Sequence, residues 1–278
     1  MTPDPAPSLR QLLAFYLDAG VDCALAEDPI NRMLDDAPEP AAPEPRPIVK
    51  PALHAKPPPP LAFGAPPASP DAAIISAREA AATAPTLEAL RELMQRFDGC
   101  ALRATATQLV FADGNPQAKV MFVGEAPGRD EDIEGLPFVG RSGKLLDLML
   151  AAIGLNRGNV YIANVIPWRP PGNRTPTPQE TQICLPFIRR QIELVNPDLL
   201  VTLGNPSTQA LLGTRDGIMR TRGRWFDYDT GTRTIRALPT LHPAYLLRQP
   251  TYKRLAWQDL RAIATALSAA SALSGPSA

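Results

Sequence analysis

Four short apolar runs divide residues 120–241 of the chain into a repeating pattern. They lie at residues 120–123, 160–163, 199–204 and 235–241, and the segments between them carry apolar residues at helical spacing. Continuous apolar runs are typical of strands that are buried on both faces. Strands that alternate with helices form parallel sheets through right-handed crossovers. The pattern therefore predicts an α/β fold, with a parallel sheet covered by helices on both faces.

Two of the segments between the runs have the periodicity of amphipathic helices. The apolar face of the first contains Leu145, Leu148, Met149 and Ala152. The apolar face of the second contains Ile183, Phe187, Ile188, Ile192 and Val195. We expect both faces to pack against the sheet.

Polar residues follow the ends of three of the runs. The first run passes into the segment 124–128, which contains Glu125, the second ends at Asn164, and the fourth ends at His242. In open α/β sheets, ligands bind outside the carboxyl ends of the strands. We therefore expect Glu125, Asn164 and His242 to lie at one rim of the sheet.

Three motifs resemble those of the family 4 uracil-DNA glycosylases in order and spacing. They are GEAPG at 124–128, Asn164 with RPPGNRTP at 169–176, and HPAYLL at 242–247. The resemblance covers residues 97–268. It implies a three-layer α/β/α sandwich with a central four-stranded parallel sheet, and an enzyme that excises uracil from DNA and leaves an abasic site.

The catalytic candidates follow from the chemistry of such a reaction. Cleavage of an N-glycosidic bond produces a cationic sugar and a uracil anion, so the site must stabilise charge. We expect His242 to donate a hydrogen bond to uracil O2. Either Glu125 or Glu131 is expected to position the attacking water, and both remain candidates. Asp130 and Asp132 are expected to be solvated.

The candidates for binding the base are Asn164, Phe138 and Ala126. An amide side chain that faces N3–H and O4 accepts uracil and mismatches cytosine, whose donor and acceptor pattern is inverted. An aromatic ring stacks on the plane of any base. The competing interpretations are structural: Asn164 in a turn after a strand, and Phe138 in the core.

Contacts with DNA are expected from five residues. The target base must leave the duplex before an enzyme can act on it. Leu246 or Leu247 is expected to wedge into the vacated space while Arg248 meets a phosphate, unless this segment only begins the last helix. Ser207, at a predicted helix start, and Arg174 are the other two candidates.

The charge distribution supports a nucleic-acid partner, although the net charge is zero. Residues 1–140 carry 11 basic and 20 acidic residues, whereas residues 141–278 carry 17 and 8. Fifteen of those 17 are Arg, which suits phosphate contact better than Lys does. One loop contains four of them, Arg215, Arg220, Arg222 and Arg224.

The cysteines depart from the family pattern. Family 4 members usually hold a 4Fe-4S cluster on four cysteines, and the resemblance places these positions at Phe97, Cys100, Trp168 and Cys184. Cys23 lies far upstream. Because such clusters need thiolates, we predict no cluster and no other cofactor, with Phe97 and Trp168 filling the volume. Three cysteines in 278 residues fit a reducing compartment.

The domain organisation is read from composition. Residues 1–30 form an expected amphipathic helical segment, and residues 31–72 a Pro/Ala-rich disordered linker, with 13 prolines between 38 and 70. Residues 73–270 form the catalytic domain and 271–278 a flexible tail. The apolar stripe of the first segment contains Leu9, Leu12, Leu13, Tyr16 and Leu17. It suits either a protein partner or packing on the catalytic domain.

These observations predict a monofunctional DNA glycosylase of base excision repair, acting on uracil in single- or double-stranded DNA. The alternative is a non-catalytic or altered-specificity DNA-damage-binding protein on the same fold. No apolar run reaches the length of a membrane span, and the N-terminus lacks the features of an export signal. We therefore expect a cytoplasmic protein associated with the nucleoid.

Overall fold

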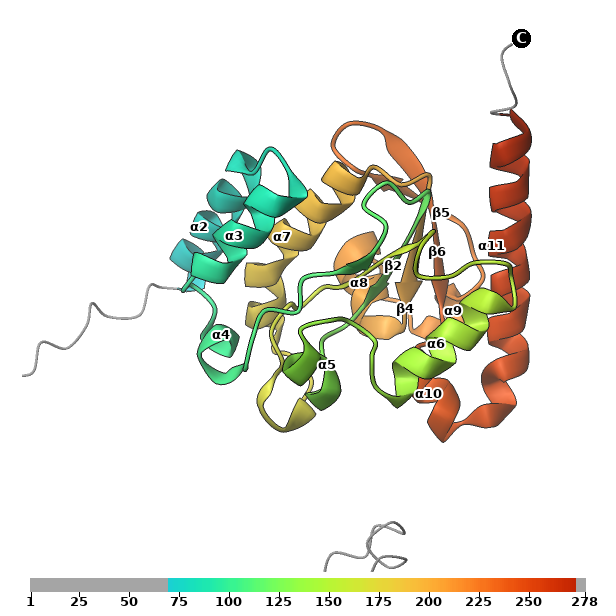
Figure 1. The fold of residues 1–278 in the computed structure, drawn as a ribbon, viewed down its shortest axis with the longest axis horizontal. Helices are drawn as coiled ribbons and strands as arrows, with labels where there is room; N and C mark the ends of the chain where they lie inside the picture. The colour runs from blue at the N-terminus through green and yellow to red at the C-terminus, as the bar shows by residue number, and fades with distance from the viewer. Residues whose placement is uncertain (1–69, 274–278) are drawn as a thin grey trace, which may run out of the picture. The chain divides into compact units, whose positions relative to one another are not determined.

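A six-stranded mixed sheet lies at the centre of the fold (Figure 1). The computed structural model describes residues 70–273, with side chains for residues 71–269. The strand order is β1-β3-β2-β4-β6-β5. The strands are β1 (Asp113–Gly114), β2 (Val120–Gly124), β3 (Tyr161–Asn164), β4 (Leu199–Leu203), β5 (Phe226–Asp229) and β6 (Thr234–Thr240).

The four expected runs form the parallel centre of this sheet. Neighbouring strands among β3, β2, β4 and β6 pair in parallel, whereas β1 and β5 add antiparallel edges. The expectation of a central four-stranded parallel sheet is therefore met only in part, because the sheet is mixed and has six strands. Two-residue β1 and the largely exposed β5 lack the continuous apolar run by which a central strand is found.

Helices cover both faces of the sheet (Figure 1). One face carries α2 (Pro70–Thr83), α3 (Leu87–Arg96), α7 (Pro178–Val195) and α8 (Asn205–Leu212). The other carries α6 (Arg141–Ala151), α10 (Pro243–Arg248) and α11 (Lys253–Leu273). The short elements are α4 (Ala101–Thr105), α5 (Arg129–Glu134), α9 (Ile218–Thr221) and the 3-10 turns η1 (Pro171–Asn173) and η2 (Pro250–Tyr252).

Alternation along the central strands divides the core in two. In β2, Met121 and Val123 join the core beneath α2, α3 and α7, whereas Val120 and Phe122 join the core beneath α6 and α11. Successive side chains of a strand point to opposite faces, so a strand covered on both sides must be apolar at every position. This requirement explains why apolar residues predominate in the four runs of the sequence.

One of the two predicted helix faces is confirmed. All five apolar residues expected to face inward from α7 are buried. In α6, by contrast, Leu148 is 68% exposed and the buried residues include Leu146, Met149 and Leu150. The apolar residues of α6 fit two overlapping faces, and packing against the sheet and α10 selects the second.

The predicted domain limits differ slightly from the helix ends. Helix α2 begins at Pro70, so it includes the last residues assigned to the linker, and α11 continues to Leu273, beyond the expected end of the domain. The predicted N-terminal helical segment and nearly all of the linker lie outside the described residues. Among the described helices, none is long and apolar enough to cross a membrane.

Candidate active site

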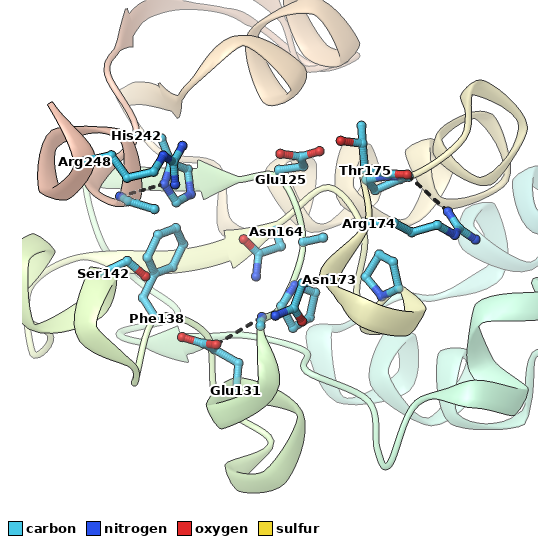
Figure 2. A pocket seen from close by; sticks show the side chains of 16 residues that line it. Glu125, Glu131, Phe138, Ser142, Asn164, Asn173, Arg174, Thr175, His242 and Arg248 are labelled. Atoms are coloured by element: carbon cyan, nitrogen blue, oxygen red, sulfur yellow. Dashed lines mark hydrogen bonds between the residues drawn. The ribbon is translucent and has the colours of Figure 1, made fainter. Parts of the chain in front are cut away.

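A cavity of about 320 Å³ opens at the carboxyl ends of the parallel strands (Figure 2). Glu125 follows β2, Asn164 ends β3 and His242 follows β6, and all three line the cavity. The expectation that these residues meet at one rim is therefore confirmed. Ala126 and Phe138 line the same cavity, as does Glu131.

Asn164 presents an unsatisfied amide oxygen at the cavity. The residue is 6% exposed, and its Oδ1 has no hydrogen-bond donor within residues 70–273. Gly124 is its partner in the parallel ladder, and a Cβ atom on Gly124 would lie 2.5 Å from Oδ1. Glycine thus permits the close approach of the amide. Because buried polar groups are almost always paired, this acceptor is suited to a ligand that donates.

Phe138 lies in the loop between α5 and α6 with a backbone conformation that is rare for a bulky residue. Its φ is 55°, in the left-handed region, and the side chain is 4% exposed. The ring stacks on the His242 imidazole with a centroid distance of 5.5 Å and an interplanar angle of 29°. Backbone strain of this kind persists only where the surrounding structure enforces it.

His242 is held as a neutral imidazole. Its Nδ1 accepts a hydrogen bond from the Ala244 amide at 3.1 Å, so the ring proton resides on Nε2. Burial lowers the pKa of His242 to about 4, and the positive charge of Arg248 acts in the same direction. The ring therefore offers an Nε2–H donor to a ligand without carrying a positive charge at neutral pH.

Two carboxylates line the cavity, those of Glu125 and Glu131, and Glu125 is the one available to a ligand. No hydrogen bond to its carboxylate is found in the described part of the chain, and the side chain is half-buried. Desolvation raises the pKa of Glu125 above its usual range. A second cavity of about 40 Å³ also has Glu125 in its wall, and this volume is large enough for a water molecule.

Glu131 has its carboxylate engaged by the backbone. The side chain is 7% exposed and accepts hydrogen bonds from the amides of Gly128 at 3.0 Å, Val139 at 3.1 Å and Gly140 at 3.0 Å. These contacts tie the start of α5 to the loop before α6. The two carboxylates that the sequence leaves equivalent are therefore different in geometry.

Asp132 is not solvated, contrary to expectation. It is 3% exposed, and its carboxylate accepts hydrogen bonds from the Thr107 amide and hydroxyl, each at 2.8 Å. The side chain thereby joins α5 to the segment after α4. Asp130 is exposed, as expected.

The two leucines proposed as wedges differ in exposure. Leu247 is 36% exposed, whereas Leu246 is 1% exposed and belongs to the core beneath α6 and α11. Leu246 is therefore excluded as a wedge in this conformation. Arg248 is exposed beside the cavity.

Two other DNA-binding candidates are constrained by contacts. Ser207 is fully buried, and its hydroxyl donates to the Leu203 carbonyl at 3.0 Å, so a phosphate cannot reach it. The prediction of this residue rested on its place at a helix start, and the hydroxyl is instead bonded to the protein's own backbone. Arg174 is exposed and lines the cavity, although it also pairs with Glu180 at 2.6 Å.

One member of the predicted arginine cluster is structural. Arg222 pairs with the buried carboxylate of Asp259 and donates to the Leu255 carbonyl at 2.7 Å. Three members remain exposed, Arg215, Arg220 and Arg224.

Phe97, Cys100, Trp168 and Cys184, which the resemblance assigns to the cluster positions, form an aromatic and thiol group. Phe97 and Trp168 stack with a centroid distance of 6.4 Å, and the sulfurs of Cys100 and Cys184 lie 4.0 Å apart. Trp168 is 1% exposed. Two thiols do not supply the four ligands of a 4Fe-4S cluster. Within the described residues, no group of three or more His, Cys, Asp or Glu could hold a metal. We call Phe97 and Trp168 the aromatic plug.

Residues that sequence reasoning missed also line the cavity. Ser142 lies in the first turn of α6, and Asn173 and Thr175 lie in the loop that precedes α7. The last two belong to the RPPGNRTP motif, so the motif carried a signal for them. Nothing in the periodicity marks Ser142.

Comparison with known proteins identifies the superfamily of the chain. Residues 111–261 match the uracil DNA glycosylase superfamily, and because this is more than half of the chain, the protein belongs to that superfamily. It is similar to the type-4 uracil-DNA glycosylase of Thermotoga maritima, with 40% identity over 177 residues, 63% of this chain and 91% of the relative.

Two further similarities have different extents. The type-4 uracil-DNA glycosylase of Archaeoglobus fulgidus is 40% identical over 178 residues, 63% of this chain and 89% of the relative. A DNA polymerase of Bacillus phage SP01 is 29% identical over 155 residues, which cover 55% of this chain and only 16% of the polymerase.

Proposed function

We propose that this protein is a monofunctional uracil-DNA glycosylase, which hydrolyses the N-glycosidic bond of uracil in DNA and so begins base excision repair. The observation that carries the proposal is the Asn164 amide, whose buried oxygen lacks a donor at a cavity shared with Phe138 and His242. Membership of the superfamily and the 40% identity to two type-4 uracil-DNA glycosylases support the same activity.

Uracil is recognised through one edge and one face. Asn164 Oδ1 accepts from N3–H, and its Nδ2 donates to O4. Cytosine presents an amino donor and an N3 acceptor there, so it would leave buried polar groups unpaired. The Phe138 ring stacks on the base plane, and Ala126 forms part of the wall of the cavity.

His242 stabilises the leaving group. As the bond between N1 and C1′ breaks, its electron pair departs with uracil, and negative charge develops on O2. The Nε2–H of the neutral ring donates to that oxygen. Because the pKa of His242 is about 4, the ring is already in this neutral form at neutral pH. A preorganised donor of this kind contributes about 10²- to 10³-fold to the rate.

Glu125 positions the water. Its carboxylate is free of protein hydrogen bonds in the described residues, and it lies between the base cavity and the small water-sized cavity. The water oxygen bonds to C1′ and passes a proton to the carboxylate, whose negative charge also stabilises the cationic sugar. Glu131 acts indirectly, because it holds the loops that form the cavity.

DNA is held at the rim of the cavity. Leu247 wedges into the stack when the base leaves, and Arg248 and Arg174 contact the backbone phosphates. The substrate is single- or double-stranded DNA that contains uracil. The site of action is the cytoplasm, at the nucleoid.

The aromatic plug takes the place of the iron-sulfur cluster. Its rings occupy two of the four ligand positions, and Phe97 also meets Phe187 edge-on at 5.0 Å. We expect protein purified without oxygen to contain no stoichiometric iron and to lack the broad visible absorption of a cluster. One cluster of iron per chain would contradict this part of the proposal.

The activity is tested with an oligonucleotide that carries one uracil, single-stranded or opposite G or A, followed by alkaline cleavage. We expect cleavage by the wild-type protein, and losses of about 10²-fold or more in Glu125→Gln and His242→Ala. The matched control is Glu134→Gln, an exposed carboxylate on neighbouring α5. Intact DNA binding without cleavage would instead favour the damage-binding alternative.

A further inference from the structure

The strained backbone of Phe138 needs stabilising contacts from outside its own loop. Phe138 lies in the Phe138 loop, residues 135–140, which joins α5 to α6. A left-handed φ of 55° is costly for an aromatic residue and does not persist without support. The loop also packs tightly on α6, since a Cβ atom at Gly143 would lie 1.6 Å from the Phe138 carbonyl oxygen.

Arg157 donates hydrogen bonds to two backbone carbonyls of this loop. Its guanidinium donates to the carbonyl of Phe138 through Nη2 and to that of Pro137 through Nη1, the latter at 3.2 Å. The residue lies in the turn just before β3, and it is absent from the wall of the active-site cavity. Arg157 therefore has no direct contact with the cavity and can act on the site through the loop.

Two carboxylates fix the guanidinium in place. Nη1 pairs with Asp113 of β1 at 2.5 Å, and Nε pairs with Asp147 of α6 at 2.8 Å. The side chains of Arg157 and Asp113 are each 26% exposed, so the pair is partly shielded from solvent. The planar guanidinium has five N–H donors and can bond to two carboxylates and two carbonyls at once. An ammonium group cannot do this with the same geometry.

The opposite side of the loop is held by Glu131. Its carboxylate accepts from the amides of Val139 and Gly140, the two residues that follow Phe138. Carbonyls before the bend and amides after it are thus both bonded to charged side chains. Charge-assisted hydrogen bonds are stronger than neutral ones and so can stabilise a strained turn.

We infer that Arg157 is a positioning residue for base excision: through its bonds to the Pro137 and Phe138 carbonyls, it holds the Phe138 ring in the orientation that stacks on the base. This inference rests on the proposed glycosylase function for its kinetic consequence. Its structural part, that Arg157 clamps the loop, does not depend on that function.

The test compares Arg157→Ala with Arg233→Ala. Arg233 is a matched control, because it too bonds to two carbonyls, those of Asn196 and Pro197, and pairs with Asp198 at 2.9 Å. It lies outside the active-site cavity. Hydrogen exchange in peptides that cover residues 135–142 and single-turnover excision of uracil are measured for both variants, well below their unfolding temperatures.

We expect faster exchange in residues 135–142 and a loss of about 10- to 100-fold in excision rate for Arg157→Ala, because small misplacements at a site have effects of that size. Arg233→Ala keeps the wild-type values in both measurements. Arg157→Lys retains the positive charge but lacks the planar set of donors. We expect its hydrogen exchange and its excision rate to fall between those of wild type and Arg157→Ala. In a Phe138→Ala background, adding Arg157→Ala causes no further loss of rate, because both changes remove the same contact.

The outcomes separate the two proposals. If wild-type protein does not excise uracil, the proposed function fails, and the exchange measurement alone decides whether Arg157 holds the loop. Unchanged exchange in Arg157→Ala overturns the inference whatever the activity. Faster hydrogen exchange in Arg157→Ala with an unchanged excision rate overturns the positioning role. The same follows if the losses of excision rate in Arg157→Ala and Phe138→Ala are fully additive in the double variant.

Discussion

The Phe138 ring and the His242 imidazole stack with their centroids 5.5 Å apart (Figure 2). One ring comes from the loop before α6 and the other from the end of β6. The contact joins the group that would face the base plane to the group that would bind the base edge. A shift of either ring would therefore disturb both recognition and charge stabilisation.

The acid limb of the pH–rate profile should belong to Glu125. Desolvation raises the pKa of this carboxyl above its usual range, whereas His242 stays neutral down to about pH 4. We expect kcat/KM to fall on acidification, as the Glu125 carboxylate gains a proton at a pH above the ordinary value of about 4.3. The Glu125→Gln variant should keep a low, flat rate over this range. An acid limb that survives in Glu125→Gln would assign it to another group.

The stability of the fold should depend on pH through His242. Its pKa is about 4 in the folded protein, against about 6.5 for an unperturbed histidine. Between these values the unfolded state binds more protons, so the free energy of unfolding falls as pH decreases from about 6.5 to about 4. Above that window His242 contributes no pH dependence. Between pH values of about 6.5 and about 4, the free energy of unfolding should fall more steeply with decreasing pH in wild type than in His242→Asn, as thermal unfolding at a series of pH values would show. The same pH dependence in both proteins would contradict the lowered pKa of His242.

Asn164→Asp should reduce the preference for uracil over cytosine. The carboxylate can accept from uracil N3–H but repels O4, and it can accept from the cytosine amino group but repels N3. We expect uracil excision to fall by about 10²-fold or more, since a buried polar mismatch is strongly disfavoured. Rates are compared on single-stranded oligonucleotides with one uracil or one cytosine. A variant with wild-type discrimination would show that Asn164 does not read the base edge.

Leu246 and Leu247 form a matched pair for testing the wedge. Leu247→Ala removes an exposed side chain, so we expect slower excision from double-stranded DNA, little change on single strands and little change in stability. Leu246→Ala creates a cavity in the core and should lower the free energy of unfolding by about 2–5 kcal/mol. Urea titrations and excision rates on both substrates make the comparison. An equal loss on single and double strands for Leu247→Ala would exclude the wedge.

The sequence is sufficient to predict the centre of the fold and the place of the site. Continuous apolar runs identify the four parallel strands, and the polar residues after three of them identify the rim where Glu125, Asn164 and His242 meet. Both conclusions rest on local pattern and on the geometry of parallel sheets. The edge strands escape prediction because their residues have no such pattern.

Properties that depend on tertiary packing are not predicted. Leu246 and Leu247 are adjacent and chemically alike, yet one is buried and the other exposed. Glu125 and Glu131 are likewise equivalent in sequence, and only the folded loops engage Glu131 in three backbone hydrogen bonds. Arg157 has no motif, because its role arises from contacts between segments that are distant in the chain.

The aromatic plug should be essential for stability. Trp168 is 1% exposed and stacks on Phe97, so Trp168→Ala removes a large buried ring from the core. We expect the free energy of unfolding to fall by about 3–5 kcal/mol. Trp257→Ala is the matched control, because Trp257 is 43% exposed on α11 and should change stability by less than about 1 kcal/mol. Urea unfolding followed by circular dichroism measures both. Equal effects of the two substitutions would show that the aromatic plug has no special structural role.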